Sequence, residues 1–431
     1  MKLVGDTLEE FMETMQAHVP KYDDVPLYER EYKPACLIRK AEKQGEPVYF
    51  RVKDSPLLLV SAVLTSRRDL TRLFNTDDLS TAYNELSRIR EYSETIETNE
   101  HSWAEYRETE DISTLPWIKF YEKDGGYYLT SSIVSVCING VCNASIHRIM
   151  LSPQGSILIR LVPRHLYRLA KEYTGKGYSL PVTIVMGVHP LHTLAAATSP
   201  PLGVYELAYS ARKLSSKLYK SPLHGNPVPK ANIIVEARIT PELGREGPFV
   251  DAMGTYDRVR EQHVLEIERI YYKPGGMAHI ILPGGKEHAL LMGFPREAEI
   301  YASVSRVVPK VHKVALTPAS GGWLHAVISI SKNTDGDAKN AIMAAFAGHP
   351  SLKHVVIVDD DIDPDDPYQV EWAIATRFQA SKDLVVINNA RGSTLDPSAK
   401  DGVTSKMGLD ATKPLHAGET FEKAGIPGCS D

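Results

Sequence analysis

The spacing of apolar and polar residues over the first hundred positions predicts a small α/β domain. A capping box at Thr7-Leu8-Glu9-Glu10 precedes apolar residues at helical spacing, so we expect the chain to open with an amphipathic helix. Apolar runs at 47–52 and 57–60 have the length and composition of strands, and the charged segment 66–100 is mostly helical in pattern. These elements predict an N-terminal α/β domain over residues 1–115.

From about residue 116 the pattern changes to short β-rich runs separated by turn signals. Helical segments at 165–173 and 203–218 interrupt these runs. The spacing favours an antiparallel barrel over a doubly wound sheet, so we expect a β-barrel domain over residues 116–302. The strand-like runs are 127–130, 133–142, 156–162, 182–188, 232–239, 264–272 and 277–282.

Strand and helix patterns alternate again in the last third of the chain. This alternation predicts a C-terminal α/β domain over residues 303–431. The fold class expected for the whole chain is therefore a multidomain protein of mixed α+β and α/β type. The predicted elements are strands at 323–330, 354–358 and 384–387 and helices at 336–346 and 370–378.

Composition and charge restrict the partners of the protein. The chain has 431 residues and a formal net charge of −5, whereas nucleic-acid binding shows as a strongly basic balance. No window approaches the ~20 apolar residues of a membrane helix, and the N-terminus has no apolar core of signal-peptide length. We therefore expect a cytoplasmic protein with neither a nucleic-acid nor a membrane partner.

The cysteines do not form a metal-binding pattern. Cys36, Cys137, Cys142 and Cys429 include no CxxC pair, which argues against a zinc ribbon or a thioredoxin motif. A two-residue turn at Asn139-Gly140 would place Cys137 opposite Cys142, so a cross-strand disulfide is geometrically conceivable. Two free thiols in a reducing cytosol are the favoured expectation.

The segment Asn143 to Arg148 follows this hairpin and is strand-like. Strict alternation places Asn143, Ser145 and His147 on one face of the strand and Arg148 on the other. Taken from spacing alone, Arg148 is expected to be a surface strand residue. A site that uses Asn143 and Arg148 together would need a bulge, or a ligand lying edge-on to the strand.

His165 and Glu206 are candidate metal ligands that depend on convergence with Asn143. A lone histidine is usually a structural hydrogen-bonding residue, and a glutamate in the first turn of a helix usually complements the helix dipole. If the three side chains meet, they offer one nitrogen and two oxygen ligands. That mixture suits Mg²⁺ or Mn²⁺ better than structural zinc.

Two carboxylates, Glu246 and Asp251, flank a Gly-Pro-Phe turn. Acids near turns are commonly solvated loop residues, but an apolar Phe249 beside a carboxyl group would raise its pKa and suit it to general acid catalysis. The chain contains no G-x-G-x-x-G, Walker A or G-x-S-x-G motif. Rossmann dinucleotide binding, P-loop chemistry and serine hydrolysis therefore lack sequence support.

Eight short motifs, in order and spread over most of the chain, carry a family resemblance. They are Asn143-x-Ser145-Ile146-x-Arg148, Arg164-His165-Leu166, 194–198 (LAAAT), Glu206-Leu207-Ala208, 246–251 (EGPFVD), 358–363 (VDDDID), 372–377 (WAIATR) and 405–412 (SKMGLDAT). Each motif is weak by itself. Together, in this order, they resemble the UbiD family of decarboxylases, which use prenylated FMN.

The resemblance implies a fold, a cofactor site and a catalytic triad. The implied fold is an N-terminal α/β domain, a split β-barrel similar to flavin reductases, and a C-terminal α/β domain. Asn143, His165 and Glu206 would hold Mn²⁺ or Mg²⁺, with K⁺ as a further ion. Arg148, Glu246 and Asp251 match the catalytic Arg-Glu-acid triad. The implied cofactor contacts are Asn143, Ser145, Ile146, His147, Arg148, Arg160, Arg164, His165, Thr198, Glu206 and Lys406.

Two positions depart from the family pattern. Val250 stands where the pattern usually has glycine, which could narrow the substrate side of the loop. Asp251 stands where some relatives carry glutamate, and its shorter side chain moves the carboxyl group back by roughly 1.5 Å. Proton delivery by this acid is therefore expected to differ from that of the glutamate-bearing relatives.

The resemblance also implies a reaction and its partners. Arg148 would pair with the substrate carboxylate and Glu246, and Asp251 is favoured over Glu246 as the proton donor. The chain is similar to the archaeal branch that converts trans-anhydromevalonate 5-phosphate to isopentenyl phosphate. His147, Arg168 or a lysine would then anchor the phosphate.

Two alternatives stay open, and two partners are expected. The protein could instead be an aromatic acid decarboxylase, such as a polyprenyl-hydroxybenzoate enzyme, or a flavin carrier without turnover of its own. A carrier would not need Arg148, Glu246 and Asp251 together. We expect a flavin prenyltransferase to supply the cofactor and the chain to form a homo-oligomer.

Overall fold

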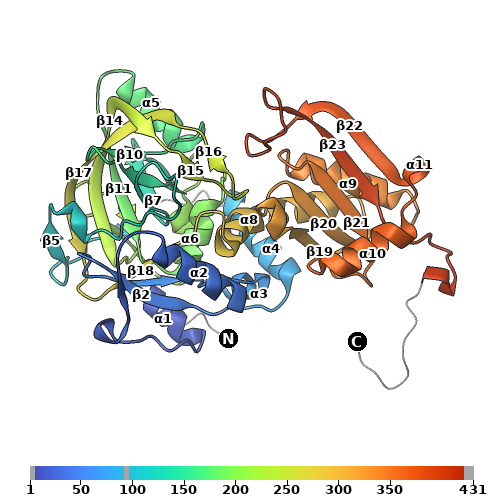
Figure 1. Cartoon of the computed structure of the whole chain (residues 1–431), viewed down its shortest axis with the longest axis horizontal. Coiled ribbons are helices and arrows are strands. Elements are labelled where there is room, and N and C mark those ends of the chain that lie inside the picture. The colour runs from blue at the N-terminus through green and yellow to red at the C-terminus, as the bar shows by residue number, and fades with distance from the viewer. Residues whose placement is uncertain (1–4, 92–96, 422–431) are drawn as a thin grey trace. The chain divides into compact units, whose positions relative to one another are not determined.

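A computed structural model describes residues 5–91 and 97–421, which form two compact units (Figure 1). Unit 1 takes its described residues from 1–78 and 88–295, and unit 2 from 79–87 and 296–431. Helix α8 (Lys286–Val304) runs from the first unit into the second. The other helices of unit 1 are α1 (Leu8–Thr14), α2 (Lys33–Gln44), α3 (Arg67–Arg72), α5 (His165–Thr174), α6 (Pro190–Ala197) and α7 (Glu206–Lys213).

Helix α1 begins as its sequence predicts. The Thr7 side chain accepts a hydrogen bond from the Glu10 amide, and the Glu10 carboxylate accepts one from the Thr7 amide. This reciprocal capping satisfies amide groups that have no partner inside the helix. Leu8, Phe11 and Met12 are buried, so the predicted apolar face packs into the core.

The N-terminal sheet combines segments that are distant in the sequence. Its strands run in the order β1 (Leu27–Tyr28), β2 (Val48–Val52), β3 (Leu58–Ser61) and β18 (Met277–His279). Strand β18 pairs in parallel with β3, although it comes from the segment expected to form the middle domain. The three sequence-based domain boundaries stay a prediction.

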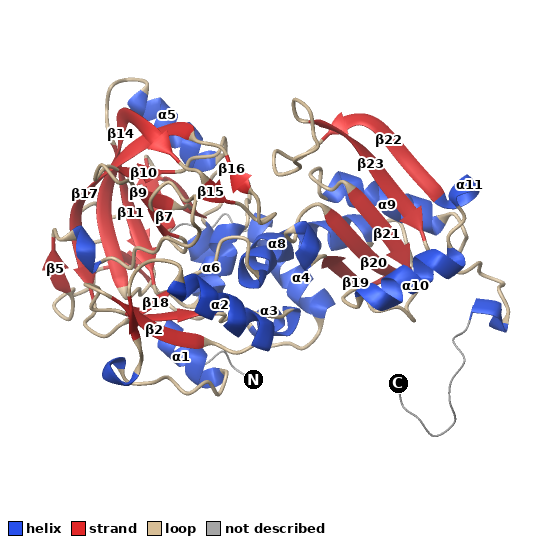
Figure 2. Ribbon diagram, in the orientation of Figure 1, coloured by secondary structure: helices blue, strands red, loops and turns tan. Residues whose placement is uncertain are grey.

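The largest sheet of the described residues has nine strands and is antiparallel at every pairing, as expected from the run spacing (Figure 2). Within the described chain the series ends at β6 on one side and β8 on the other, so these strands form no closed barrel. In spatial order the strands are β6 (Tyr127–Leu129), β9 (Ile149–Leu151), β10 (Ile157–Ile159), β17 (Arg260–Tyr272), β14 (Ile233–Glu246), β11 (Leu180–Met186), β7 (Ile133–Ile138) and β8 (Val141–Ile146), and β5 (Arg107–Thr109) also pairs with β17.

Two smaller β structures complete unit 1. Strands β13 (Pro227–Val228), β12 (Leu218–Lys220) and β4 (Thr98–Asn99) form a short sheet, and β15 (Phe249–Val250) pairs with β16 (Tyr256–Asp257) as a ribbon. The ribbon follows directly after β14 and precedes β17. It therefore carries the Gly-Pro-Phe segment beside the ends of the two longest strands.

Unit 2 is a sheet with a helix on each face, as the alternation of strand and helix predicts. Ile328 of β20 (His325–Ser331) and Ile357 of β21 (His354–Val358) pack in one hydrophobic cluster with residues of α9 (Asp337–Gly348). Val327 and Val356 of the same two strands pack in another cluster with residues of α10 (Pro367–Arg377). Successive strand residues point to opposite faces, so both faces of these strands are buried. The sheet order is β19 (Lys310–Leu316), β20 (His325–Ser331), β21 (His354–Val358), β23 (Val403–Asp410) and β22 (Leu384–Arg391), with α4 (Leu79–Ser87), α9 (Asp337–Gly348), α10 (Pro367–Arg377) and α11 (Ala380–Asp383).

None of the helices in the described parts of the chain is both long enough and apolar enough to cross a membrane.

Candidate functional site

Strand β8 and the first turn of α7 bring together two of the three predicted metal ligands. Asn143 Nδ2 donates to Glu206 Oε1 at 3.0 Å, and the Ala144 amide donates to Glu206 Oε2 at 2.8 Å. Glu206 opens α7, as predicted, and its carboxyl group is buried. Burial is the largest cause that raises the pKa of Glu206 to about 8. The site thus holds a buried acid that a bound cation would stabilise in its charged form.

The predicted alternation along β8 is confirmed by a chain of hydrogen bonds on one face. Ser145 Oγ donates to Asn143 Oδ1 at 3.2 Å and lies 2.8 Å from His147 Nε2. His147 Nδ1 lies 2.8 Å from the carbonyl oxygen of Arg160. Burial is the largest cause that lowers the pKa of His147 to about 4. His147 is therefore neutral at pH 7 and presents no charge to an anion.

The third predicted metal ligand, His165, is hydrogen-bonded to the backbone of another segment. It opens α5, and its Nε2 lies 2.8 Å from the carbonyl oxygen of Pro200. Arg164 donates to Ser199 Oγ at 2.8 Å, and Thr198 Oγ1 donates to the Ala195 carbonyl oxygen at the end of α6. These contacts place the start of α5 beside residues 198–200, the first part of the connection from α6 to α7.

Arg148 is largely buried and paired, which contradicts its expected place on the surface. Its Nε and Nη2 donate to the two carboxylate oxygens of Glu246 at 2.8 and 2.9 Å, and the side chains are 14% and 0% exposed. The pair forms because Arg148 immediately precedes β9 and Glu246 ends β14, at the same end of the strands of this sheet. Burial acts to lower the pKa of Arg148, but the hydrogen bonds and charge of Glu246 outweigh it and raise that pKa.

The ribbon after Glu246 supplies an apolar wall and the second acid. The Arg148 guanidinium lies over the Phe249 ring, 4.5 Å from its centroid. Asp251 Oδ1 accepts hydrogen bonds from the Met253 amide at 2.8 Å and from Thr255 Oγ1 at 3.3 Å. Burial is the largest cause that raises the pKa of Asp251.

Sequence reasoning missed Asp257 and Arg260. Asp257 lies 3.5 Å from Arg148 Nη2 through one oxygen and 2.5 Å from Arg260 Nη2 through the other. The opposite charges three residues apart were visible in the sequence. That spacing is also typical of exposed ion pairs, so it does not indicate a site by itself.

Two further titratable groups near Arg148 were also missed. Asp124 is buried in a turn whose next residue, Gly125, donates its amide to the Pro248 carbonyl oxygen. Burial is the largest cause that raises the pKa of Asp124 to about 6. His288 accepts a hydrogen bond from the Gly284 amide, and its pKa is lowered to about 4 by burial first and by Arg148 second. Only their three-dimensional position distinguishes these residues from ordinary polar ones.

Two protein-family models match this chain. The family model described as the Rift-related domain of 3-octaprenyl-4-hydroxybenzoate carboxy-lyase matches residues 93–286, and the C-terminal domain of the same enzyme matches residues 289–411. The chain belongs to the UbiD family.

Relatives and a solved structure agree with this assignment. An Aeropyrum pernix protein named anhydromevalonate phosphate decarboxylase is 52% identical, with 93% of this chain and 92% of that protein covered. A Methanocaldococcus jannaschii protein of the same name is 44% identical, with coverages of 89% and 92%. The structure of the UbiD-class enzyme HmfF from Pelotomaculum thermopropionicum in complex with FMN matches with a TM-score of 0.89, 32% identity and 98% of both chains covered.

The residues of this UbiD-family chain fit the expected metal in part. Among the described residues no group of three or more histidine, cysteine, aspartate or glutamate side chains is arranged to hold a metal ion. The pair formed by Asn143 and Glu206 is not a group of this kind, because one of its two members is an amide side chain. A buried carboxylate hydrogen-bonded only to neutral donors is consistent with a cation site.

Lys406, the predicted cofactor contact in the C-terminal unit, lies on β23. Its Nζ donates to the carbonyl oxygens of Pro350 and Leu352 at 2.5 and 2.8 Å, and burial lowers its pKa. The side chain is thus held by two backbone acceptors within unit 2. A contact between Lys406 and a cofactor stays a prediction.

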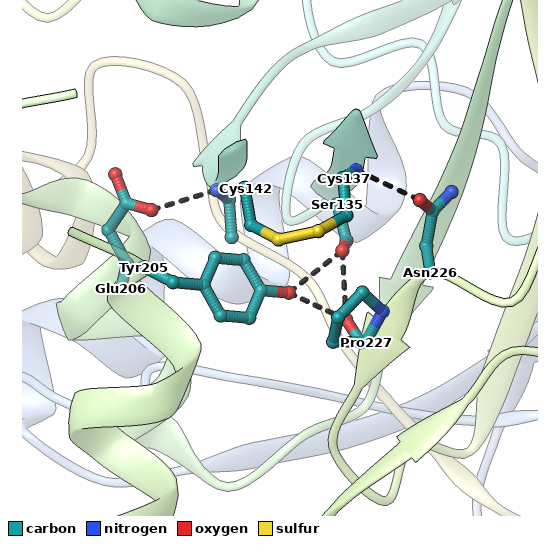
Figure 3. The surroundings of a disulfide bond; sticks show 8 residues. Ser135, Cys137, Cys142, Tyr205, Glu206, Asn226 and Pro227 are labelled. Atoms are coloured by element: carbon teal, nitrogen blue, oxygen red, sulfur yellow. Dashed lines mark hydrogen bonds between the residues drawn. A yellow bond between two sulfur atoms is a disulfide. The ribbon is translucent and has the colours of Figure 1, made fainter. Parts of the chain in front are cut away.

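The hairpin before Asn143 contains a disulfide, so the expectation of two free thiols is wrong. Cys137 and Cys142 face each other across β7 and β8 and are bonded (Figure 3). Asn139 and Gly140 both have positive φ, as the predicted two-residue turn requires. The turn geometry was readable from the sequence, whereas the argument for free thiols rested on an assumed compartment.

Proposed function

We propose that this UbiD-family chain is a non-oxidative decarboxylase that uses prenylated FMN. Its substrate is trans-anhydromevalonate 5-phosphate, and its products are isopentenyl phosphate and CO2. The observation that carries this proposal is the buried, two-fold hydrogen-bonded Arg148–Glu246 pair beside the ribbon of Asp251. The substrate assignment rests on the two archaeal relatives, which are both named anhydromevalonate phosphate decarboxylase.

Arg148 binds and orients the substrate carboxylate. Two of its nitrogens are held by Glu246, so the guanidinium plane is fixed before the substrate arrives. The Phe249 ring covers one face of the guanidinium, which reduces competition from water. A fixed and partly desolvated cation interacts strongly with an anionic group and loses little entropy on binding it.

Asp251 returns a proton to the carbon that loses CO2. Among the described residues, both Glu246 oxygens accept hydrogen bonds from Arg148, whereas Asp251 Oδ1 accepts hydrogen bonds only from a backbone amide and a hydroxyl group. The raised pKa of Asp251 keeps part of the population protonated at a higher pH than for an ordinary aspartate. Both properties are those of a general acid.

The cofactor supplies an acceptor for the electrons released when CO2 leaves, which side chains cannot provide. Asn143, His165 and Glu206 would hold Mn²⁺ or Mg²⁺, and K⁺ is a further candidate ion. Ser145, Ile146, Arg160, Arg164, Thr198 and Lys406 would contact the cofactor. The antiparallel sheet of unit 1 would be the split β-barrel of flavin-reductase type. Support for the cofactor comes from the HmfF structure, which is described in complex with FMN.

An aromatic acid decarboxylase is the second candidate within the family. A gallate decarboxylase from Lactiplantibacillus plantarum is 29% identical over 70% of this chain. Its lower identity, compared with the archaeal relatives, favours the phosphorylated aliphatic substrate. A flavin carrier is disfavoured because a carrier has no need for the buried Arg148–Glu246 pair and a nearby acid of raised pKa.

A substrate panel tests the proposal. The chain is co-expressed with a flavin prenyltransferase, and CO2 release is measured from the phosphorylated unsaturated acid, an acrylic acid and an aromatic acid. We expect the phosphorylated acid to have the highest kcat/KM. Faster release from the aromatic acid would favour the second candidate, and bound flavin without CO2 from any acid would favour the carrier. Homo-oligomer formation and a cytoplasmic location stay expectations from the sequence.

A further inference from the structure

Four charged residues converge where neighbouring strands of the large sheet end. Ile149 of β9 pairs with Ile159 of β10, and the Arg160 amide donates to the Arg148 carbonyl oxygen at 3.1 Å. On the next pair of strands, Glu246 of β14 lies opposite Arg260 of β17. Strands β10 and β17 are themselves neighbours. The sheet register therefore places Arg148, Arg160, Glu246 and Arg260 at the same end of four neighbouring strands.

Asp257 connects two arginines of this group, Arg148 and Arg260. Its Oδ1 lies 2.5 Å from Arg260 Nη2, and its Oδ2 lies 3.5 Å from Arg148 Nη2. Asp257 is held in turn by the ribbon, where it pairs with Phe249. The Arg260 guanidinium is thus separated from the Arg148 guanidinium by a single carboxylate group.

The positive charges of this group exceed the negative ones. Arg148, Arg160 and Arg260 contribute three positive charges, and Glu246 and Asp257 contribute two negative charges. Among the described residues the hydrogen bond recorded for the Arg160 side chain goes to the Leu161 carbonyl oxygen, and no carboxylate lies within ion-pair distance of it. Burial first, and then the charges of Arg260 and Arg148, lower the pKa of Arg160. The charges of these five residues thus sum to +1, which favours a further anion, and the neighbouring acids Asp124 and Asp251 have raised pKa values, mainly because they are buried.

The exposed fractions of the Arg148 and Arg260 side chains differ. The Arg148 side chain is 14% exposed and is held by Glu246, whereas Arg260 is 24% exposed and has Asp257 as its recorded carboxylate partner. The phosphate anchors considered from the sequence fit less well. His147 is neutral, and Arg168 is exposed on α5.

We propose that Arg260, held by Asp257, anchors the phosphate of the substrate while Arg148 holds its carboxylate. This assignment rests on the proposed function and names the residue that sets its specificity. A phosphate is a strong acceptor for a guanidinium, which can donate two parallel hydrogen bonds to it. Arg260 would thus select phosphorylated acids over uncharged analogues of the same carbon skeleton.

The test compares two substrates in holoenzyme variants. One substrate is the phosphorylated unsaturated acid, and the other carries a hydroxyl group in place of the phosphate. For Arg260→Gln we expect KM for the phosphorylated acid to rise by ~10–100-fold, the usual size of a lost charge-assisted hydrogen bond. The kcat for that acid, both constants for the hydroxyl analogue, and the bound flavin should change little. Arg260→Lys, which keeps the charge, should recover part of the loss.

Arg258→Gln is the matched control, because Arg258 is a neighbouring exposed arginine outside the group. We expect it to leave both substrates unaffected. An equal effect of Arg260→Gln on both substrates, or no effect on either, would overturn the assignment and leave Arg260 as a structural ion pair.

Calorimetry of the binding of the phosphorylated acid tests the phosphate anchor at Arg260 separately from the proposed decarboxylation. Binding that is lost in Arg260→Gln supports the anchor even if the wild-type protein releases no CO2, a result that would contradict the proposed reaction alone. Binding that is equally tight in wild type and Arg260→Gln contradicts the anchor, even if CO2 is released.

Discussion

Arg148 and Glu246 show why a buried ion pair needs a functional explanation. Removing both charges from water is expensive, and such pairs often contribute little to net stability. Glu246 is fully buried, and Arg148 donates to both of its oxygens. A pair with this geometry fixes a cation in position, which is of use to an enzyme that binds a carboxylate. The spacing of Arg148 in the strand gave no indication of this, because its partner is distant in the sequence.

The pH dependence of turnover should report Asp251. A proton donor must be protonated, so the rate falls as the pH rises through its folded-state pKa. Because burial raises the pKa of Asp251, this fall should come at a higher pH than for an ordinary aspartate. Asp251→Asn should lose ~100-fold in kcat and lose this limb of the kcat–pH profile.

Thr255→Val is a companion variant for the same measurement. The Thr255 hydroxyl donates to Asp251 and lowers its pKa. Its removal should move the alkaline limb to higher pH without abolishing turnover. An unchanged limb in both variants would exclude Asp251 as the titrating donor.

Metal content tests the role of His165. If His165 completes the site of Asn143 and Glu206, then His165→Ala should purify with less than stoichiometric Mn²⁺ and with more loosely bound flavin. Elemental analysis of protein grown with manganese measures this directly. Arg168→Ala, an exposed position on the same helix, is the control. Stoichiometric manganese in His165→Ala would refute the ligand role.

At the scale of elements, the sequence predicted local structure better than it predicted partners. The capping box of α1, the turn at Asn139-Gly140 and the alternation of Asn143, Ser145 and His147 were all readable, because each depends on residues close in the sequence. The pairings of β3 with β18 and of Glu246 with Arg260 depend on residues brought together by the chain path. The family resemblance, rather than any local pattern, placed Arg148 and Glu246 in one site.

The β7–β8 disulfide should stabilise the hairpin that carries Asn143. Because the bridged cysteines are only five positions apart, the loop-closure entropy corresponds to about 2 kcal/mol at most. Reduction with dithiothreitol should lower the free energy of unfolding by up to this amount in urea titrations. Cys36→Ser should show the same dependence on reductant as wild type, since Cys36 is a free, exposed cysteine. A wild-type protein with no dependence would contradict a disulfide in solution.

At the scale of the whole molecule, the antiparallel sheet and the C-terminal α/β unit were both expected from the pattern of runs. The alternation of apolar residues carried that prediction, because it reports which faces of a strand are buried. Membership of the UbiD family is confirmed, and the substrate assignment follows the archaeal relatives. The role of Arg260 was not predictable in this way, because it depends on the register of several strands.

The most direct test of the account is CO2 release by wild type and Glu246→Gln, both loaded with prenylated FMN and given the phosphorylated unsaturated acid. The account predicts one CO2 per acid consumed by wild type. It predicts a loss of at least ~100-fold in rate for the variant, because the Arg148 guanidinium is no longer held in position, with flavin and metal content unchanged. Near-normal turnover by Glu246→Gln, or no CO2 from the loaded wild-type protein, would contradict it.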